Sequence, residues 1–145
     1  MQCPMPGVNT DDDVKLTDIF HTCKNIAIIG LSPDENKASN IVAKYLQLQG
    51  YKIIPVYPKE DVILGEKVYK SLLDIEQRVD MVDMFRKPAI ADTLIEEAIQ
   101  RGDVKCFWLQ LGIVNDSAIQ KAIDAGMIGV QNKCSKIEHQ RLFEK

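Results

Sequence analysis

The chain has 145 residues, of which 46% are hydrophobic, and a formal net charge of −3. This length suits one domain, with a core large enough to need no disulfide or metal. The mild acidity without a basic block argues against nucleic acid as a partner, and no apolar run reaches the ~20 residues needed to span a bilayer. The start, residues 1–13, is polar, acidic and proline-containing, so we predict no signal peptide and a cytoplasmic location.

Short apolar runs alternate with helical patterns along the chain. In chain order, the spacing of apolar residues predicts a helix over 16–23, a strand over 25–30, a helix over 38–49, a strand over 51–57, a loop over 59–65, a very short strand at 68–69, a helical turn or two over 71–75, a strand over 81–85, a helix from 87 to 101, a strand over 104–109, a helix around 118–123 and a strand over 127–130. The tail, 132–145, is polar, and we expect Ile137, Leu142 and Phe143 to anchor it on the domain.

Strands that alternate with helices predict parallel pairing through right-handed crossovers. The sequence therefore predicts an α/β fold with a single doubly wound, mostly parallel, Rossmann-like sheet and helices on both faces. We expect residues 1–23 to form an N-terminal segment and a helix packed on the domain formed by 24–145.

The four cysteines, Cys3, Cys23, Cys106 and Cys134, are isolated and lack the spacing of a disulfide framework or a zinc site. We therefore predict no metal. Cys106 lies in an apolar run and reads as a small core residue. Cys134 follows Asn132 and Lys133 in a polar stretch, where either an inert thiol or a reactive one fits.

Ligands of open parallel sheets bind at the carboxyl ends of the strands. The loop after the first strand contains Gly30, Ser32 and Lys37, followed by Ser39, and leads into a helix whose free N–H groups favour an anion. A phosphate site is one interpretation. The other is a plain turn with Ser39 or Asn40 as the helix cap.

The loops that follow the later strands contribute further candidates. Lys59, after the second strand, suits an additional phosphate and so favours NADP or coenzyme A over NAD, unless it is simply a solvated lysine. Arg86 can reach a phosphate or a carbonyl, and Gln110 and Asn115 could bind amide groups.

No nucleophile and base are brought together by the predicted elements. Asp80 and Asp83 fall on opposite faces of a strand, so they cannot share one site. His21 and His139 lie on the first helix and in the tail, away from the predicted crevice, and read as surface or structural residues. We therefore predict no catalytic residue.

Several motifs together resemble a known family. They are IAIIGLS at 26–32, KAS at 37–39, VAKYL at 42–46, GYKIIPVYP at 50–58, VDMFRK at 82–87, WLQLGI at 108–113 and NKCSKIE at 132–138. Their order and spacing, over about 24–142, resemble the small CoA-binding proteins, which look like a free-standing N-terminal domain of the succinyl-CoA synthetase alpha subunit.

The resemblance implies that coenzyme A lies across the carboxyl ends of the strands. By the same resemblance, Gly30, Ser32, Lys37 and Ser39 hold phosphates, Val56, Tyr57 and Pro58 line the adenosine side, Phe85 and Arg86 contact the middle of the ligand, and Gln110 and Cys134 lie nearer the pantetheine. Two positions depart from the family pattern: Tyr57 stands in place of Asn, and Lys37 where Arg is common, which replaces a bidentate donor with a point charge.

The leading hypothesis is thus a module that binds coenzyme A or an acyl-CoA without catalysis of its own, because the synthetase's phosphorylated histidine belongs to a downstream domain. The alternatives are an NADP-dependent oxidoreductase and a regulatory subunit of an acyl-CoA enzyme. We expect no nucleic-acid or membrane partner, and the sequence leaves the oligomeric state open.

Overall fold

The computed structural model describes residues 10–143. The expectations for Cys3 and for the segment 1–9 lie outside the described residues. In chain order the elements are α1 (Thr10–Thr22), β1 (Asn25–Ile29), α2 (Ala38–Leu48), β2 (Lys52–Val56), β3 (Val62–Ile63), β4 (Glu66–Lys67), a 3-10 turn η1 (Leu72–Asp74), β5 (Met81–Met84), α3 (Ile90–Arg101), β6 (Cys106–Leu109), α4 (Asp116–Asp124), β7 (Ile128–Val130) and α5 (Ser135–Phe143).

Five strands form one sheet in the order β2-β1-β5-β6-β7, and every neighbouring pair is parallel. The winding reverses between β1 and β5, because the chain moves outward to β2 first and then returns to the other side of β1. The prediction of a doubly wound, Rossmann-like α/β fold is confirmed. The central strands are buried on both faces, which explains why each reads as a continuous apolar run.

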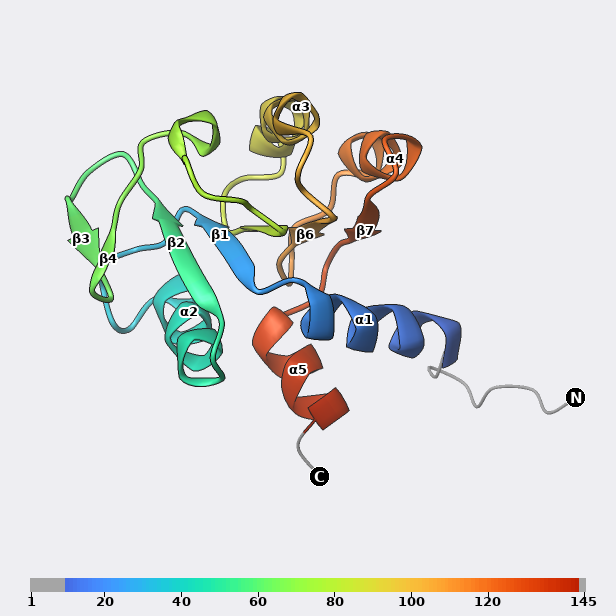
Figure 1. Cartoon of the computed structure of the whole chain (residues 1–145), viewed down its shortest axis with the longest axis horizontal. Helices are drawn as coiled ribbons and strands as arrows, with labels where there is room; N and C mark the ends of the chain where they lie inside the picture. The colour runs from blue at the N-terminus through green and yellow to red at the C-terminus, as the bar shows by residue number, and fades with distance from the viewer. Residues whose placement is uncertain (1–9, 144–145) are drawn as a thin grey trace, which may run out of the picture.

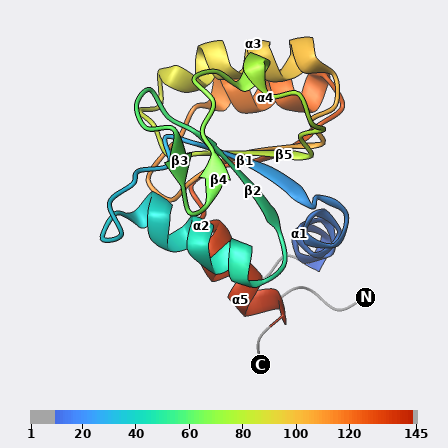
Figure 2. The same cartoon turned by 60° about the vertical axis from the view of Figure 1, so that its left-hand side comes forward.

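Helices cover both faces of the sheet. In Figure 1, α3 and α4 lie above the sheet, and α1, α2 and α5 lie below it; the turned view in Figure 2 shows the same layers. The upper core contains Ile29, Val82 and Phe107, and the lower core contains Ile28, Phe20 and Trp108. The alternation of Phe107 and Trp108 between the two cores follows from the two-residue period of a strand.

The segment expected to be a loop, 59–65, contains the first strand and the turn of a small hairpin, β3 and β4, so that expectation was wrong for 62–63. Its two-residue turn has φ of 54° at Leu64 and 77° at Gly65. Positive φ at both positions is the geometry of tight hairpin turns, which Asn-Gly usually announces in a sequence. A leucine in the first position hides this signal. The short strand expected at 68–69 is a single bridge between Tyr69 and Val56.

The polar tail forms α5, a helix that the sequence did not predict. Leu142 and Phe143 pack against the lower core as expected, but Ile137 is 52% exposed, so its assignment as an anchor was wrong. His139 is buried in its place, between the rings of Phe20 and Phe143. An aromatic cluster, and not an aliphatic stripe, thus holds α5 on the domain. The sequence of this helix therefore shows only a weak apolar periodicity.

Asp83 lies within β5 and Asp80 immediately precedes that strand. The two carboxylates do not share a site, as predicted. Asp80 accepts hydrogen bonds from the main-chain N–H groups of Lys24 and Asn25, both at 3.0 Å, and pairs with Arg78. It ties together the starts of β1 and β5. Within residues 10–143, no helix is long and apolar enough to cross a bilayer, and no three His, Cys, Asp or Glu side chains are grouped to hold a metal ion.

Candidate functional site

Four strands end in one row at the carboxyl edge of the sheet. Ile29 of β1 lies between Val56 of β2 and Met84 of β5. Met84 in turn lies beside Leu109 of β6. The residues that follow these four positions are Gly30, Tyr57, Phe85 and Gln110. The structure therefore brings four expected site residues together at the edge where the winding reverses, which is where such folds bind ligands.

Gly30 lets two main-chain segments and one side chain meet closely. Its φ is +85°, and its N–H donates a 2.8 Å hydrogen bond to the carbonyl oxygen of Val56. A Cβ atom at this position would lie 2.6 Å from Cδ of Arg86. Glycine is therefore required both by the backbone conformation and by the stem of Arg86, which lies against it.

The loop that follows Gly30 is fixed by α2. The Ser39 hydroxyl oxygen accepts the Ser32 N–H at 3.0 Å, and Nδ2 of Asn40 donates to the Ser32 carbonyl at 2.8 Å. The Ser32 hydroxyl oxygen accepts the N–H of Asp34 at 3.1 Å. Because both hydroxyl oxygens accept from main-chain amides, each retains its own O–H proton to donate to a ligand.

The first turn of α2 points at this loop without a side-chain cap. Lys37 is the N-cap residue and its side chain makes no capping hydrogen bond, so the interpretation with Ser39 or Asn40 as the cap was wrong. Uncapped amides at a helix start carry partial positive charge and favour an anion. The geometry thus suits the phosphate site that the sequence suggested, with Lys37 exposed beside it.

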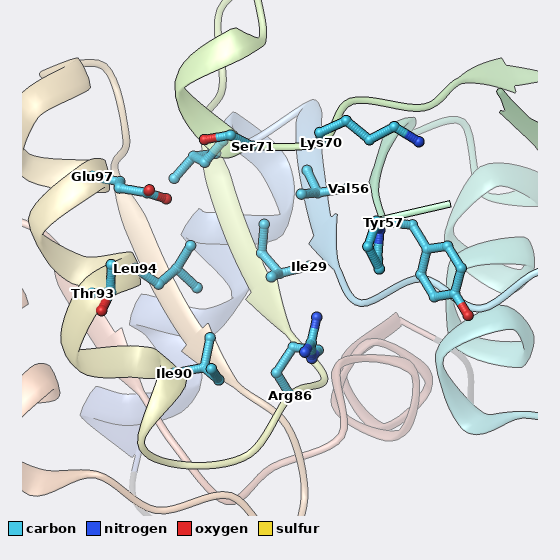
Figure 3. A pocket seen from close by; sticks show the side chains of 12 residues that line it. Ile29, Val56, Tyr57, Lys70, Ser71, Arg86, Ile90, Thr93, Leu94 and Glu97 are labelled. Atoms are coloured by element: carbon cyan, nitrogen blue, oxygen red, sulfur yellow. The ribbon is translucent and has the colours of Figure 1, made fainter. Parts of the chain in front are cut away.

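A cavity of about 310 Å³ opens on the α3 side of this edge. We call it the Arg86 cavity. It is lined by Ile29, Val56, Tyr57, Pro58, Lys70, Ser71, Leu72, Arg86, Ile90, Thr93, Leu94 and Glu97. Figure 3 shows Ile29, Val56, Leu94 and Arg86 around the cavity, with Glu97 at its far side, while the side chains of Tyr57 and Lys70 extend away from its centre. Val56, Tyr57 and Pro58, which the resemblance placed on the adenosine side, all lie here.

Charge in the Arg86 cavity is divided between cations and one carboxylate. Arg86 and Lys70 contribute the positive charge. Lys59, which favoured an extra phosphate in the sequence, is exposed and outside the lining. Burial, and then the nearby Asp74 carboxylate, raise the pKa of Glu97.

A second cavity of about 250 Å³ lies on the α2 and α5 side of the same edge. We call it the Phe85 cavity. Its lining is Ala38, Val42, Phe85, Gln110, Leu111, Ile113, Cys134 and Ile137. Because Phe85 and Arg86 are consecutive, their side chains serve cavities on opposite faces of the sheet. The loop after β5 thus forms the ridge between the two cavities.

Gln110 is committed to a buried hydrogen-bond network below the Phe85 cavity. Its Nε2 donates to Asp83 Oδ1 at 2.5 Å and to the Ser135 hydroxyl at 2.8 Å, and that hydroxyl donates to Asp83 Oδ2 at 2.8 Å. Burial raises the pKa of Asp83 to about 7, against the lowering effect of the hydrogen bonds from Gln110 and Ser135. The amide donors expected to bind a ligand are therefore occupied, and Gln110 retains its carbonyl oxygen.

Of the remaining candidates, Asn115 supports the fold and Cys134 lies at a cavity. Asn115 does not bind amide groups of a ligand, since its Oδ1 caps α4 by accepting the Ala118 N–H at 3.0 Å and its Nδ2 donates to the Pro88 carbonyl. Cys134 is a half-buried free thiol at the Phe85 cavity, whereas Cys106 is fully buried in the core as predicted.

Sequence reasoning missed the upper wall of the Arg86 cavity. Lys70 and Ser71 reach the end of β2 because the Val56–Tyr69 bridge carries them there. Glu97 lies seven residues after Ile90 on α3, and this spacing places both on one face of the helix. In the sequence, the apolar stripe of α3 marks its core face, and nothing beside it shows that Glu97 faces a cavity.

Three comparisons place the chain among known proteins. A family model described as a CoA binding domain matches residues 24–140. The uncharacterized protein YneT of Bacillus subtilis is 35% identical over 125 residues, covering 86% of this chain and 92% of YneT. The solved structure of a hypothetical protein from Pyrococcus horikoshii has 39% identity and a TM-score of 0.86, and the match covers 98% of this chain and 97% of that one.

Larger enzymes share part of the sequence. An ADP-forming acetate–CoA ligase of Methanocaldococcus jannaschii is 37% identical over 79 residues, which is 54% of this chain and 11% of the ligase. The chain thus spans about a tenth of that enzyme.

Proposed function

Because the chain belongs to the CoA binding domain family, we propose that it binds coenzyme A, free or acylated, across the carboxyl edge of its sheet. The observation that carries this proposal is the arrangement of two different cavities on opposite faces, joined at an edge that favours an anion. The order of groups in coenzyme A matches this arrangement: an adenosine at one end, a pyrophosphate in the middle and an uncharged amide chain at the other end.

The pyrophosphate would lie at the junction, over Gly30. The uncapped amides of α2 and the O–H groups of Ser32 and Ser39 are donors there. Arg86 makes no hydrogen bond or ion pair with any residue in the described part of the chain, so its guanidinium is available to a phosphate. Charge-assisted bonds of this kind are about twice as strong as neutral ones.

The two arms of the ligand would then follow the chemistry of the cavities. The adenosine fits the Arg86 cavity, whose apolar floor includes Ile29 and Leu94. Lys70, whose Nζ donates to the Glu60 carbonyl oxygen at 3.1 Å, is the second cation of the lining and has further N–H donors for the ribose phosphate. The pantetheine fits the Phe85 cavity, where the carbonyl oxygen of Gln110 can accept an amide N–H and Cys134 lies in the same lining.

We limit the proposal to binding. Neither His21 nor His139 lines either cavity. His139 is instead a structural residue, since Tyr45 Oη lies at hydrogen-bond distance, 2.7 Å, from its Nδ1 and aromatic rings surround it.

Calorimetric titration at neutral pH tests the proposal, with coenzyme A and NADPH as separate ligands. We expect a dissociation constant for coenzyme A well below 1 mM, and a loss of about 10- to 100-fold in Arg86→Ala, since that change removes charge-assisted hydrogen bonds. Lys105→Ala is the matched control, because Lys105 is an exposed cation at the opposite edge of the sheet. Affinity weaker than millimolar, or an unchanged Arg86→Ala, would overturn the proposal. Tighter binding of NADPH would replace it with the oxidoreductase alternative.

A further inference from the structure

The Arg86 cavity has two chemically different ends. Arg86 comes from the loop after β5, at the ridge between the two cavities. Glu97 comes from the third turn of α3. Figure 3 shows the Glu97 carboxylate and the Arg86 guanidinium on opposite sides of the cavity, with Ile29 lying between them. A ligand whose phosphates lie at Arg86 therefore presents its far end to Glu97.

Glu97 has no partner among the residues that the structure describes. No hydrogen bond or ion pair reaches its half-buried carboxylate. The preceding residue, Glu96, is by contrast exposed and pairs with Lys121 at 3.0 Å. A partly buried carboxylate without a donor is unfavourable, and the raised pKa of Glu97 reflects this environment. The Glu97 carboxylate is thus a hydrogen-bond acceptor in the cavity that a donor on a ligand would stabilise.

The walls between the two ends are apolar and suit a flat ring. Ile29, Leu72 and Leu94 belong to the upper core and face the cavity with their outer atoms. Thr93 lies four residues before Glu97, on the same face of α3, and adds a hydroxyl to the same wall of the cavity. An aromatic base between these walls would direct its polar edge toward Thr93 and Glu97.

We propose that Glu97 determines base specificity, by accepting a hydrogen bond from the 6-amino group of adenine. This inference rests on the proposed function, because it takes the adenosine of coenzyme A as the occupant. Adenine carries an amino donor at position 6, whereas guanine and hypoxanthine carry a carbonyl oxygen there. A carboxylate beside position 6 accepts from the amino group and repels the carbonyl oxygen, whereas the N1–H that a 6-oxopurine offers in exchange lies on the adjoining ring atom. The site is thereby selective for adenine over 6-oxopurines.

Two ligands separate this inference from the proposed function. They are coenzyme A and its deaminated analogue, in which hypoxanthine replaces adenine and every other group is unchanged. We expect wild-type protein to bind coenzyme A about 10- to 100-fold more tightly, the range for a hydrogen bond to a charged group. In Glu97→Gln, the side-chain amide can turn to offer either a donor or an acceptor, so the preference should fall to within about threefold.

Glu96→Gln is the matched control, since it makes the same chemical change one residue away and outside the cavity. It should retain the wild-type preference. Equal binding of the two compounds by wild-type protein, or full retention of the preference in Glu97→Gln, overturns the role of Glu97 and leaves the proposed function standing. Binding of neither compound by wild-type protein overturns both.

Discussion

Asp83 is a fully buried acid whose protonation should be visible in the stability of the protein. It lies on β5 and accepts hydrogen bonds from Gln110 and from Ser135, the first residue of α5. Burial raises its pKa from 3.8 to about 7 despite those bonds. Asp83→Asn keeps the shape of the side chain and removes the ionisable proton. We expect the variant to lose one pH-dependent part of the free energy of unfolding.

The sign and size of the contribution of Asp83 to the free energy of unfolding follow from its pKa. Because the folded chain holds the proton more tightly, this contribution to stability is fully present below pH 3.8 and is lost as the pH rises through about 7. At about 1.4 kcal/mol per pH unit, the whole window corresponds to roughly 4 kcal/mol. About 2.5 kcal/mol of this falls between about pH 5 and about pH 8.

Urea unfolding, followed by the fluorescence of the single tryptophan, Trp108, measures this directly. The difference in unfolding free energy between wild type and Asp83→Asn should change by about 2.5 kcal/mol from about pH 5 to about pH 8, to the disadvantage of wild type at high pH.

Asp103→Asn is the control. Burial would raise the pKa of Asp103, but hydrogen bonds from Arg101 and from the Val79 N–H hold it below 3.8. Its contribution is therefore lost only as the pH falls through the acid range, and the control should run parallel to wild type between about pH 5 and about pH 8. A difference between wild type and Asp83→Asn that stays constant over this range would refute the reasoning.

Two further substitutions test the site and its support. Gly30→Ala should lower the affinity for coenzyme A at least tenfold, because the added Cβ displaces Arg86. The control is Gly102→Ala, which has a similar φ of +80° but nothing within 4 Å; it adds about 1–2 kcal/mol of backbone strain and leaves the affinity unchanged. Equal calorimetric affinities for the two variants would contradict this. Arg101→Lys should destabilise the fold by about 2–3 kcal/mol in urea unfolding, because the guanidinium donates to three carbonyl oxygens within 72–77, and a change below about 0.5 kcal/mol would argue against that role.

The sheet could be predicted because its information is local. Each central strand is a short apolar run buried on both faces, and Gly30, Gly102 and Gly126 mark the ends of elements where positive φ is needed. Parallel pairing then places Tyr57 and Phe85 on either side of Gly30, and Gln110 beyond Phe85, without further information. The row at the carboxyl edge was accordingly found from the sequence.

What escaped prediction depends on contacts between distant segments. The hydrogen bonds of Gln110 require Ser135, 25 residues further along, so its occupied donors could not be recognised in the sequence. Lys70 belongs to the cavity through a single bridge of its neighbour Tyr69 to Val56. The helix α5 depends on burial of His139 among aromatic rings, which no apolar periodicity announces.

The ridge formed by Phe85 and Arg86 lies between two cavities, so a ligand long enough to fill both would be held at two places. For a ligand that occupies both cavities, binding of one half holds the other half at a high effective concentration beside its own cavity. The affinities of the two halves then multiply, whereas each half alone binds with its own weaker affinity. A chain built in this way would retain an intact ligand in the presence of that ligand's breakdown fragments, since neither fragment alone gains the benefit of being joined to the other.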